Sequence, residues 1–309
     1  MRVQFDIAQI APLRDALISF SHWDHALGSD YGVTELLQPP RIVQLKKRYR
    51  AEIAKLVDPN TLMPALRGVT IHSGLEYNLK QFVNRHPGVG YLVERKLSDK
   101  ILGRRIAGKF DVFLNGALYD FKTTSVWKFA MKEFDEYEEQ LNVYAHLLRT
   151  YGVEVSLLYI IFIFTDWDKA KAWRSAEYPK AGYCKVTLDN LWTPRQQEEF
   201  LVSRVQLQVN NEGRADHELD LCTAKEMWSK PTKWAVQKVE SGRKAKKASR
   251  LLDSEQEAKD WAEKKLEGAE HKIEYRPGQR MRCEGIEGGY CNVARWCSQF
   301  REYLKTKEK

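Results

Sequence analysis

The chain has 309 residues, of which 43% are hydrophobic and 30% are charged, and its formal net charge at pH 7 is +8. This balance is typical of a globular protein with a charge-rich surface, long enough for one large domain or two small ones. No segment approaches the roughly 18 apolar residues of a membrane span. Asp6, Arg14 and Asp15 interrupt the N-terminal segment, which therefore lacks the apolar stretch of a secretory signal. We expect a cytoplasmic protein, whose basic charge suits either an anionic partner such as nucleic acid or simply a soluble surface.

Helical spacing of apolar residues predicts helices over residues 42–57 and 69–83, joined by a proline-rich connection over 59–68. Alternating apolar residues then predict three short strands: 91–97, 104–114 and 117–125. A long amphipathic helix over 131–152 and an apolar central strand over 155–164 follow. This order predicts an α/β core of the pattern αβββαβ, with helices packed on a mixed sheet.

The C-terminal part has a different pattern. After a helix over 193–213, two strands, a helix that begins at Ser254 and a third strand predict a small ββαβ element over about 234–278. We therefore expect a core over residues 1–215 and a second region over 216–309. The second region has several cations and tryptophans that fit either a groove for a DNA backbone or a solvated face: Trp228, Trp234, Arg243, Lys244, Lys246, Lys247, Arg250, Trp261 and Trp296.

The segment "GKFDVFLNGALYDFKTTS", residues 108–125, has an unusual number of charges for a hairpin. Asn115-Gly116 predicts a type I′ turn, because both central residues of that turn need positive φ. Counting outward pairs Leu114 with Ala117 and, further on, three pairs of interest: Asp111 with Asp120, Phe110 with Phe121, and Lys109 with Lys122. One face is then apolar and faces the core: Phe110, Val112, Leu114, Ala117, Tyr119 and Phe121. The other face contains Lys109, Asp111, Asp120 and Lys122, with Phe113 and Leu118 near the turn.

Two carboxylates in direct cross-strand contact repel, and a bound cation relieves the repulsion. Mg²⁺ prefers hard oxygen ligands from one or two carboxylates and keeps positions for water and phosphate. The Asp111–Asp120 pair therefore predicts a divalent metal site. The alternative is a solvated face on which Lys109 and Lys122 neutralise the two aspartates.

Four motifs in this order resemble the PD-(D/E)XK nuclease superfamily, in particular its RecB-like and CRISPR-associated exonuclease branch and phage-encoded relatives. They are "IHSGLE" with His72, "GKFD" with Asp111, "DFK" with Asp120 and Lys122, and "QLNVY" with Gln140 and Tyr144. The resemblance covers roughly residues 65–165. It implies a restriction-endonuclease-like core, Mg²⁺ or Mn²⁺ as cofactor, and DNA as substrate.

The resemblance also implies the roles of the site residues. His72, Asp111 and Asp120 would bind the metal, together with the backbone carbonyl of Phe121. Lys122 would orient or activate the attacking water and stabilise charge on the phosphate. Gln140 and Tyr144 share a helix face and would lie beside the site, or they are core-edge residues. Glu94 precedes the hairpin and is a further candidate ligand, and Glu76 lies one helical turn after His72.

Cys222, Cys283, Cys291 and Cys297 are separated by 60, 7 and 5 residues. Neither the usual zinc spacing nor a ferredoxin run fits these intervals. The segment is similar to the cysteine-rich C-terminus of iron–sulfur nucleases in this branch, which implies a [4Fe–4S] cluster. Structural Zn²⁺ and no metal are the alternatives. Cys184 reads as a buried strand cysteine without a partner.

These observations predict a metal-dependent DNA nuclease, most simply an exonuclease, in DNA recombination, repair or phage DNA processing. It would act in the cytoplasm of a bacterium or a phage-infected host. The chain has no P-loop, so any unwinding needs a partner such as a helicase or recombination protein. The alternatives are a catalytically idle DNA-binding protein of the same fold and an accessory iron–sulfur or zinc module of a helicase–nuclease assembly.

Overall fold

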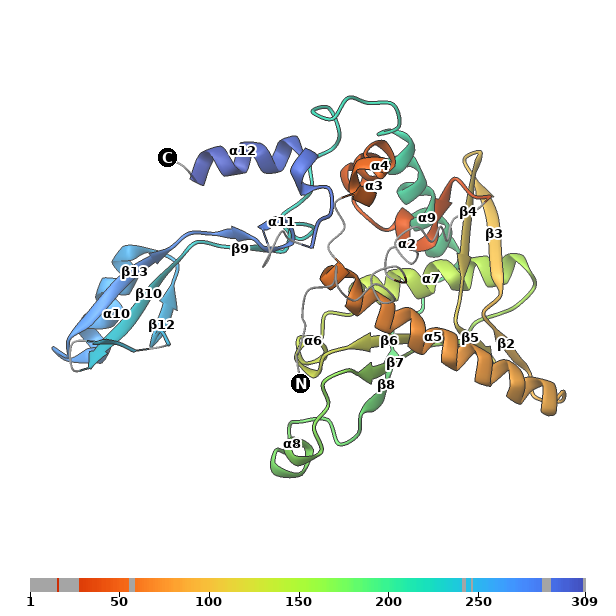
Figure 1. Ribbon diagram of the computed structural model, residues 1–309, viewed down its shortest axis with the longest axis horizontal. Coiled ribbons are helices and arrows are strands. Elements are labelled where there is room, and N and C mark those ends of the chain that lie inside the picture. The colour runs from red at the N-terminus through yellow and green to blue at the C-terminus, as the bar shows by residue number, and fades with distance from the viewer. Residues whose placement is uncertain are drawn as a thin grey trace, which may run out of the picture. The chain divides into compact units, whose positions relative to one another are not determined.

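The computed structural model describes residues 16, 28–55, 59–240, 243–245, 247–284 and 290–307 (Figure 1). The chain divides into two compact units, Met1–Gly213 and Arg214–Lys309. Among the described residues, no helix is both long enough and apolar enough to cross a membrane.

The first unit is built around a five-stranded mixed sheet. Its order is β2 (Tyr91–Val93), β5 (Val112–Leu114), β6 (Ala117–Thr124), β7 (Leu157–Phe164) and β8 (Tyr183–Leu188). β6 and β7 run parallel, and the other neighbours are antiparallel. The predicted α/β class with a mixed sheet flanked by helices is confirmed.

A second, three-stranded sheet continues from the first. Its order is β1 (Tyr31–Gly32), β4 (Arg104–Lys109) and β3 (Lys96–Ile101). The strands expected over 91–97 and 104–114 are therefore each split in two: β2 gives way to β3 at Glu94–Arg95, and β4 to β5 at Phe110–Asp111. Glu94 has a φ of +51°, a left-handed conformation that a regular strand cannot contain. Both segments therefore pass from one sheet to the other at neighbouring positions, Glu94–Arg95 and Phe110–Asp111.

Helices cover both faces of the five-stranded sheet. Phe121 and Thr123 of β6 face α5 (Pro59–Arg85), since the Phe121 ring meets His72 and Thr123 lies beside Gly68. Lys122 points to the other face and contacts α7 (Asp135–Thr150), against which α9 (Pro194–Val209) packs. The apolar core lies between these layers and includes Phe110, Leu118, Leu141, Leu158, Ile160 and Phe162.

Two expectations for the N-terminal helices were wrong. The helix expected over 42–57 is broken at Tyr49 into α3 (Pro40–Arg48) and α4 (Arg50–Lys55). The connection expected over 59–68 is instead the first part of α5, because Pro59 occupies the first turn and the helix continues through Pro64. Short helices complete the unit: α2 (Val33–Leu36), α6 (Val126–Ala130) and α8 (Lys169–Arg174).

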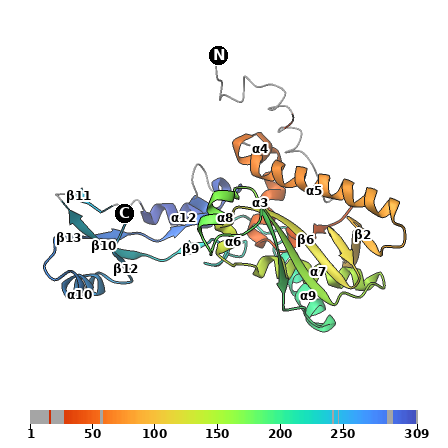
Figure 2. The same cartoon turned by 90° about the horizontal axis from the view of Figure 1, so that it is seen from below.

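The second unit contains the expected ββαβ element (Figure 2). β10 (Lys233–Glu240) pairs with β11 (Arg243–Lys244), β12 (Arg250–Leu252) and β13 (His271–Arg276). α10 (Glu255–Leu266) begins as expected after Ser254, whose hydroxyl accepts a hydrogen bond from the Glu257 N–H. Val236 packs against Ala258, Ala262 and Leu266 of the helix. The other elements are β9 (Ser229–Lys230), β14 (Gln279–Arg280), α11 (Met281–Glu284), the 3₁₀ turn Ala294–Trp296 and α12 (Ser298–Lys307).

Candidate metal and phosphate site

The bend between the two sheets brings two acidic residues together. The Glu94 backbone N–H donates to the Asp111 carbonyl at 2.8 Å, which is the rung that joins the two chains at the bend. On one side of this hydrogen bond the two segments form β2 and β5 of the five-stranded sheet, and on the other side they form β3 and β4 of the three-stranded sheet. Glu94 and Asp111 therefore occupy opposite sides of one fixed backbone contact. The left-handed conformation of Glu94 costs on the order of 1 kcal/mol and is typical of functional positions.

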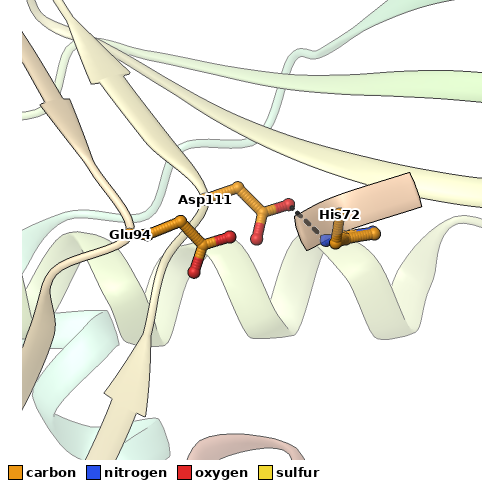
Figure 3. A group of neighbouring side chains, drawn as sticks. All are labelled: His72, Glu94 and Asp111. Carbon is orange, nitrogen blue, oxygen red and sulfur yellow. Dashed lines mark ion pairs between the residues drawn. The ribbon is translucent and has the colours of Figure 1, made fainter. Parts of the chain in front are cut away.

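His72 of α5 completes a group of three side chains that can hold a metal ion. One nitrogen of His72 and one oxygen each of Glu94 and Asp111 all lie within 4.8 Å of one another. Figure 3 shows the Asp111 carboxylate between the other two side chains, with His72 Nδ1 at 3.6 Å from Asp111 Oδ2. The neighbouring Asp111 carboxylate raises the pKa of His72, and burial raises the pKa of Glu94. The predicted ligands His72, Asp111 and Glu94 therefore lie together.

Asp120 and Lys122 form a buried ion pair on β6. Asp120 Oδ2 is 2.6 Å from Lys122 Nζ, and Lys122 Nζ also donates to Gln140 Oε1 of α7 at 3.1 Å. Burial raises the pKa of Asp120 to about 6, although Lys122 opposes the shift. Burial alone would lower the pKa of Lys122, but the attraction of Asp120 outweighs it and the pKa is raised. Lys122 is therefore a cation in this site.

The predicted hairpin register is correct up to Asp111 and wrong beyond it. The pairs Leu114–Ala117, Phe113–Leu118 and Val112–Tyr119 are present as expected. The further pairs, Asp111–Asp120, Phe110–Phe121 and Lys109–Lys122, are not part of this ladder. At the bend Asp111 turns its side chain to β6, where Oδ2 accepts from the Phe121 N–H at 2.6 Å, and Lys109 pairs with Lys96 instead.

The expected division of faces is correct only in part. Phe110, Val112 and Ala117 of the expected core face are buried. Tyr119 and Phe121 of that face are half-buried, whereas Leu118, which shares its strand face with Asp120 and Lys122, is fully buried. The reason is that α7 covers the face that bears the charges. The acidic residue of β6 thus lies at the edge of the core, and its exposed fraction is only 4%.

Tyr144 and Gly108 are coupled by close packing. Tyr144 is buried on α7, one helical turn after Gln140, with which its hydroxyl interacts. Burial raises the pKa of Tyr144, so the phenol remains neutral. A Cβ on Gly108 would lie 2.6 Å from Tyr144 Cε1 and 2.6 Å from Val33 Cγ2. The glycine of "GKFD" is therefore required for β4 to approach α7 closely.

In the sequence analysis, Lys109 was assigned the wrong partner and Tyr137 was not identified. Lys109 Nζ lies 2.5 Å from Glu94 Oε2 and 3.3 Å from Glu76 Oε2, so it neutralises Glu94 and not Asp111. Glu76 also pairs with Lys80 and lies outside the three-residue group. Tyr137 of α7 lies under Lys122, with Nζ 5.2 Å from the ring centroid. Its position three residues before Gln140 on the same helix was the available signal.

The buried carboxylates are paired with lysines. Glu94 Oε2 lies 2.5 Å from Lys109 Nζ, and Asp120 Oδ2 lies 2.6 Å from Lys122 Nζ. A carboxylate has several lone-pair sites, so each can accept a metal ion in addition to its lysine. The residues present therefore fit a divalent cation, for which histidine nitrogen and carboxylate oxygen are common ligands.

Three cysteines of the second unit, Cys283, Cys291 and Cys297, lie near one another, and the segment around Cys222 is joined to theirs through Gln299. Cys291 and Cys297 are buried, and Cys222 and Cys283 are half-buried. Burial raises the pKa of the Cys283 thiol to about 11, and the neighbouring Cys291 and Cys297 add to the shift. Gln299 connects the distant segment, because its side chain accepts from the Cys222 N–H at 2.9 Å and donates to the Cys222 carbonyl at 2.8 Å.

Cys184, expected to be buried in a strand, is a half-buried residue of β8.

Comparison with known proteins adds distant structural neighbours only. No family model and no curated protein matches the chain. The crystal structure of SSO0001 has a TM-score of 0.44 at 19% identity, over 70% of this chain and 93% of that one. A candidate exonuclease from Eubacterium rectale has a TM-score of 0.35 at 13% identity, over 72% of this chain and 96% of that one. Similarity at this level does not support a functional assignment, which rests on the residues of this chain alone.

Proposed function

We propose that the chain is a metal-dependent DNA nuclease of the PD-(D/E)XK superfamily, acting as an exonuclease in DNA recombination, repair or phage DNA processing. One observation carries the proposal. His72, Glu94 and Asp111 offer ligand atoms within 4.8 Å of one another, and Asp111 is hydrogen-bonded to the same strand that bears the Asp120–Lys122 ion pair. Metal-assisted phosphodiester hydrolysis uses a metal ion, which a histidine and three carboxylates can hold, and a buried cation can stabilise the charge that develops.

His72, Glu94, Asp111 and Asp120 would hold Mg²⁺ or Mn²⁺, with the Phe121 carbonyl as a further oxygen. The bound ion would supply a polarised phosphoryl oxygen and a metal-activated water near neutral pH. The Phe121 N–H donates to Oδ2 of Asp111 and so fixes the orientation of the carboxylate. His72 is oriented by the edge of the Phe121 ring, at 6.2 Å between centroids.

Lys122 would stabilise the negative charge that develops on the phosphate. Its raised pKa makes it a poor base, so its role is electrostatic and not proton abstraction. Gln140 holds Nζ through its side-chain oxygen, and the ring of Tyr137 lies below the ammonium group. A lysine held from three sides is pre-organised, which is the main requirement for transition-state stabilisation by charge.

Digestion of DNA by the wild type and by Asp120→Asn tests this function. The change keeps the shape of the side chain and removes its charge. With Mn²⁺ the wild type is expected to degrade linear DNA, and Asp120→Asn to be at least about 100-fold slower. Asp189→Asn, at an exposed position, is the matched control and should equal the wild type.

Linear and circular DNA, each single- and double-stranded, distinguish exonuclease from endonuclease action in the same experiment. If wild type and Asp120→Asn degrade all four equally poorly, the nuclease proposal fails and an idle DNA-binding protein is the better description. If the wild type is active only with a helicase or recombination protein added, the chain is a subunit of a larger assembly.

For the second unit we propose that Cys222, Cys283, Cys291 and Cys297 bind a [4Fe–4S] cluster, with Zn²⁺ as the alternative. The support is the proximity of Cys283 to Cys291 and Cys297, and the hydrogen bonds that join Gln299 to the backbone of Cys222. Such a group would join the end of the chain to the segment around Cys222 and stabilise the small unit.

A further inference from the structure

The hairpin of β3 and β4 has four cations on one face. Lys96 lies directly opposite Lys109, and Lys100 directly opposite Arg105. Directly paired residues of antiparallel strands share a face, so all four side chains project from the same side. All four are exposed, and the pair between them, Ser98 and Ala107, is uncharged. We call these four residues the basic stripe.

Like charges directly opposite each other on a sheet destabilise it by roughly 0.2–1 kcal/mol per pair. Glu94 and Glu76 contact Lys109 and offset the repulsion at that end of the stripe. At the other end, Asp30 accepts a hydrogen bond from the Arg105 backbone N–H at 2.7 Å. A bound polyanion would offset the repulsion between Lys100 and Arg105.

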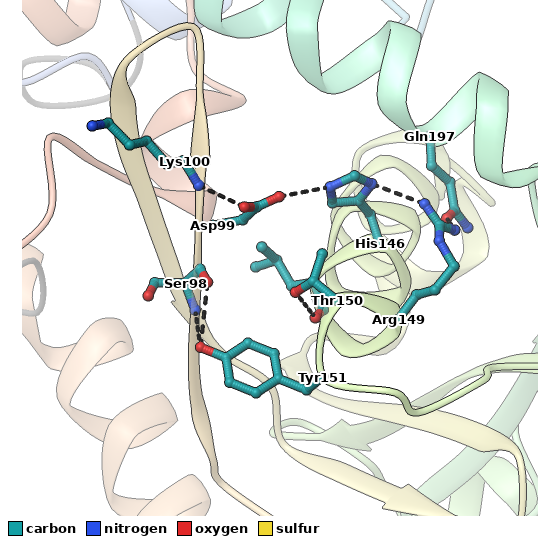
Figure 4. A network of polar contacts seen from close by, with 9 residues as sticks. Ser98, Asp99, Lys100, His146, Arg149, Thr150, Tyr151 and Gln197 are labelled. Atoms are coloured by element: carbon teal, nitrogen blue, oxygen red, sulfur yellow. Dashed lines mark hydrogen bonds and ion pairs between the residues drawn. The ribbon is translucent and has the colours of Figure 1, made fainter.

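The opposite face of the hairpin is anchored. Leu97 and Ile106 are buried, and Asp99 Oδ2 is 3.1 Å from His146 Nε2 of α7. Figure 4 shows this contact continuing from His146 to Arg149 and from Arg149 to Gln197 of α9. The Tyr151 hydroxyl also accepts a hydrogen bond from the Ser98 N–H and donates one to the Ser98 carbonyl. These backbone groups on the outer edge of β3 are therefore not available to pair with another strand. The stripe therefore has a fixed direction relative to α7, which also bears Gln140 and Tyr144.

The stripe begins at the candidate metal site. Lys109 contacts Glu94, a member of the three-residue group, and strand register places Arg105 four residues further along β4. Four residues span about 13 Å, several times the axial distance of ~3.4 Å between phosphates along one strand of duplex DNA. The geometry points to a track for the sugar–phosphate backbone, and we propose that the DNA strand leaving the site runs along the basic stripe. This inference rests on the proposed function.

The double variant Lys100→Gln/Arg105→Gln tests the track, because both residues are remote from the candidate ligands along β3 and β4. The matched control is Lys169→Gln/Lys171→Gln, two exposed cations of α8. Binding of labelled single- and double-stranded DNA is measured with a chelator present, so that no cleavage occurs, over a range of salt. The stripe variant should bind about tenfold more weakly at low salt, with a slope of log Kobs against log salt shallower by about 0.7–0.9 per lost phosphate contact.

The thermal midpoint of the stripe variant should equal or exceed that of the wild type, since like-charge repulsion is removed. With Mn²⁺ added, KM should rise while kcat stays near the wild-type value. Affinity and slope equal to those of the wild type, or a wild type that binds neither DNA, would overturn the track. If the wild type binds DNA more tightly than the stripe variant, as expected, but never cleaves it, the nuclease proposal is refuted and the track is retained.

Discussion

At the scale of single residues, Lys122 is the group whose role the site defines most sharply. It is a buried cation held by Asp120 and Gln140. Lys122→Met should reduce single-turnover cleavage by about 100-fold or more, because the charge that faces the phosphate is lost. Mn²⁺ affinity should persist, since a neighbouring cation is removed. Lys128→Met is the control: Lys128 is exposed and pairs with Glu133. Loss of Mn²⁺ binding in Lys122→Met would contradict this division of roles.

Glu94 provides a second prediction at this scale. Its buried carboxylate belongs to the three-residue group, and its oxygen Oε2 is paired with Lys109. Glu94→Gln should weaken Mn²⁺ binding by about tenfold or more, measured by titration of the ion in the absence of DNA. Glu76→Gln should leave it nearly unchanged, because Glu76 is outside the group. Equal effects of the two changes would exclude Glu94 as a ligand.

The sequence allowed some of these residues to be predicted and hid others. Asp120, Lys122 and Gln140 lie on regular elements, so spacing along the chain determines which side they face. Glu94 and Lys109 flank a bend that depends on tertiary packing, and the pairing of Lys109 with Glu94 followed only from that bend. Strand counting extends as far as the ladder does and no further.

At the scale of elements, Gly108 decides how closely β4 packs on α7. A methyl group there would lie 2.6 Å from both Tyr144 and Val33. Gly108→Ala should lower the free energy of unfolding by about 1–3 kcal/mol through overpacking. Gly74→Ala is the matched control, because Gly74 lies in α5 and a Cβ added there would meet nothing within 4 Å. That change should raise stability by about 0.5–1 kcal/mol. Chemical denaturation measures both, and a neutral Gly108→Ala would show that the close approach is not required.

The bounds of regular elements were predictable, and the breaks within elements were not. The patterns of alternating and helical spacing locate β6, β7, α7 and α10 close to their observed bounds. The breaks at Glu94, Asp111 and Tyr49 and the continuation of α5 through Pro64 could not be read from spacing. The breaks at Glu94 and Asp111 accompany hydrogen bonds between segments that are distant in sequence, which override local preference.

At the scale of the whole molecule, the proposed cluster belongs to the second unit alone. Cys297→Ser should remove the iron, or the zinc, that co-purifies with the chain, because Cys297 is one of three neighbouring thiols. It should also lower the thermal stability of Arg214–Lys309. Cys184→Ser is the control, since Cys184 belongs to β8 in the other unit. Metal analysis of both variants decides between iron and zinc, and unchanged metal content in Cys297→Ser would refute the cluster.

Binding of Mn²⁺ to the metal-free protein tests the central claim most directly, because it requires neither substrate nor catalysis. Paramagnetic resonance of the free ion reports how much Mn²⁺ the chain removes from solution. The wild type should bind Mn²⁺ at stoichiometric levels, and Asp111→Asn, which alters the carboxylate between His72 and Glu94, should bind at least about tenfold more weakly. Equal binding by the two proteins, or none by the wild type, would contradict a metal site at this bend.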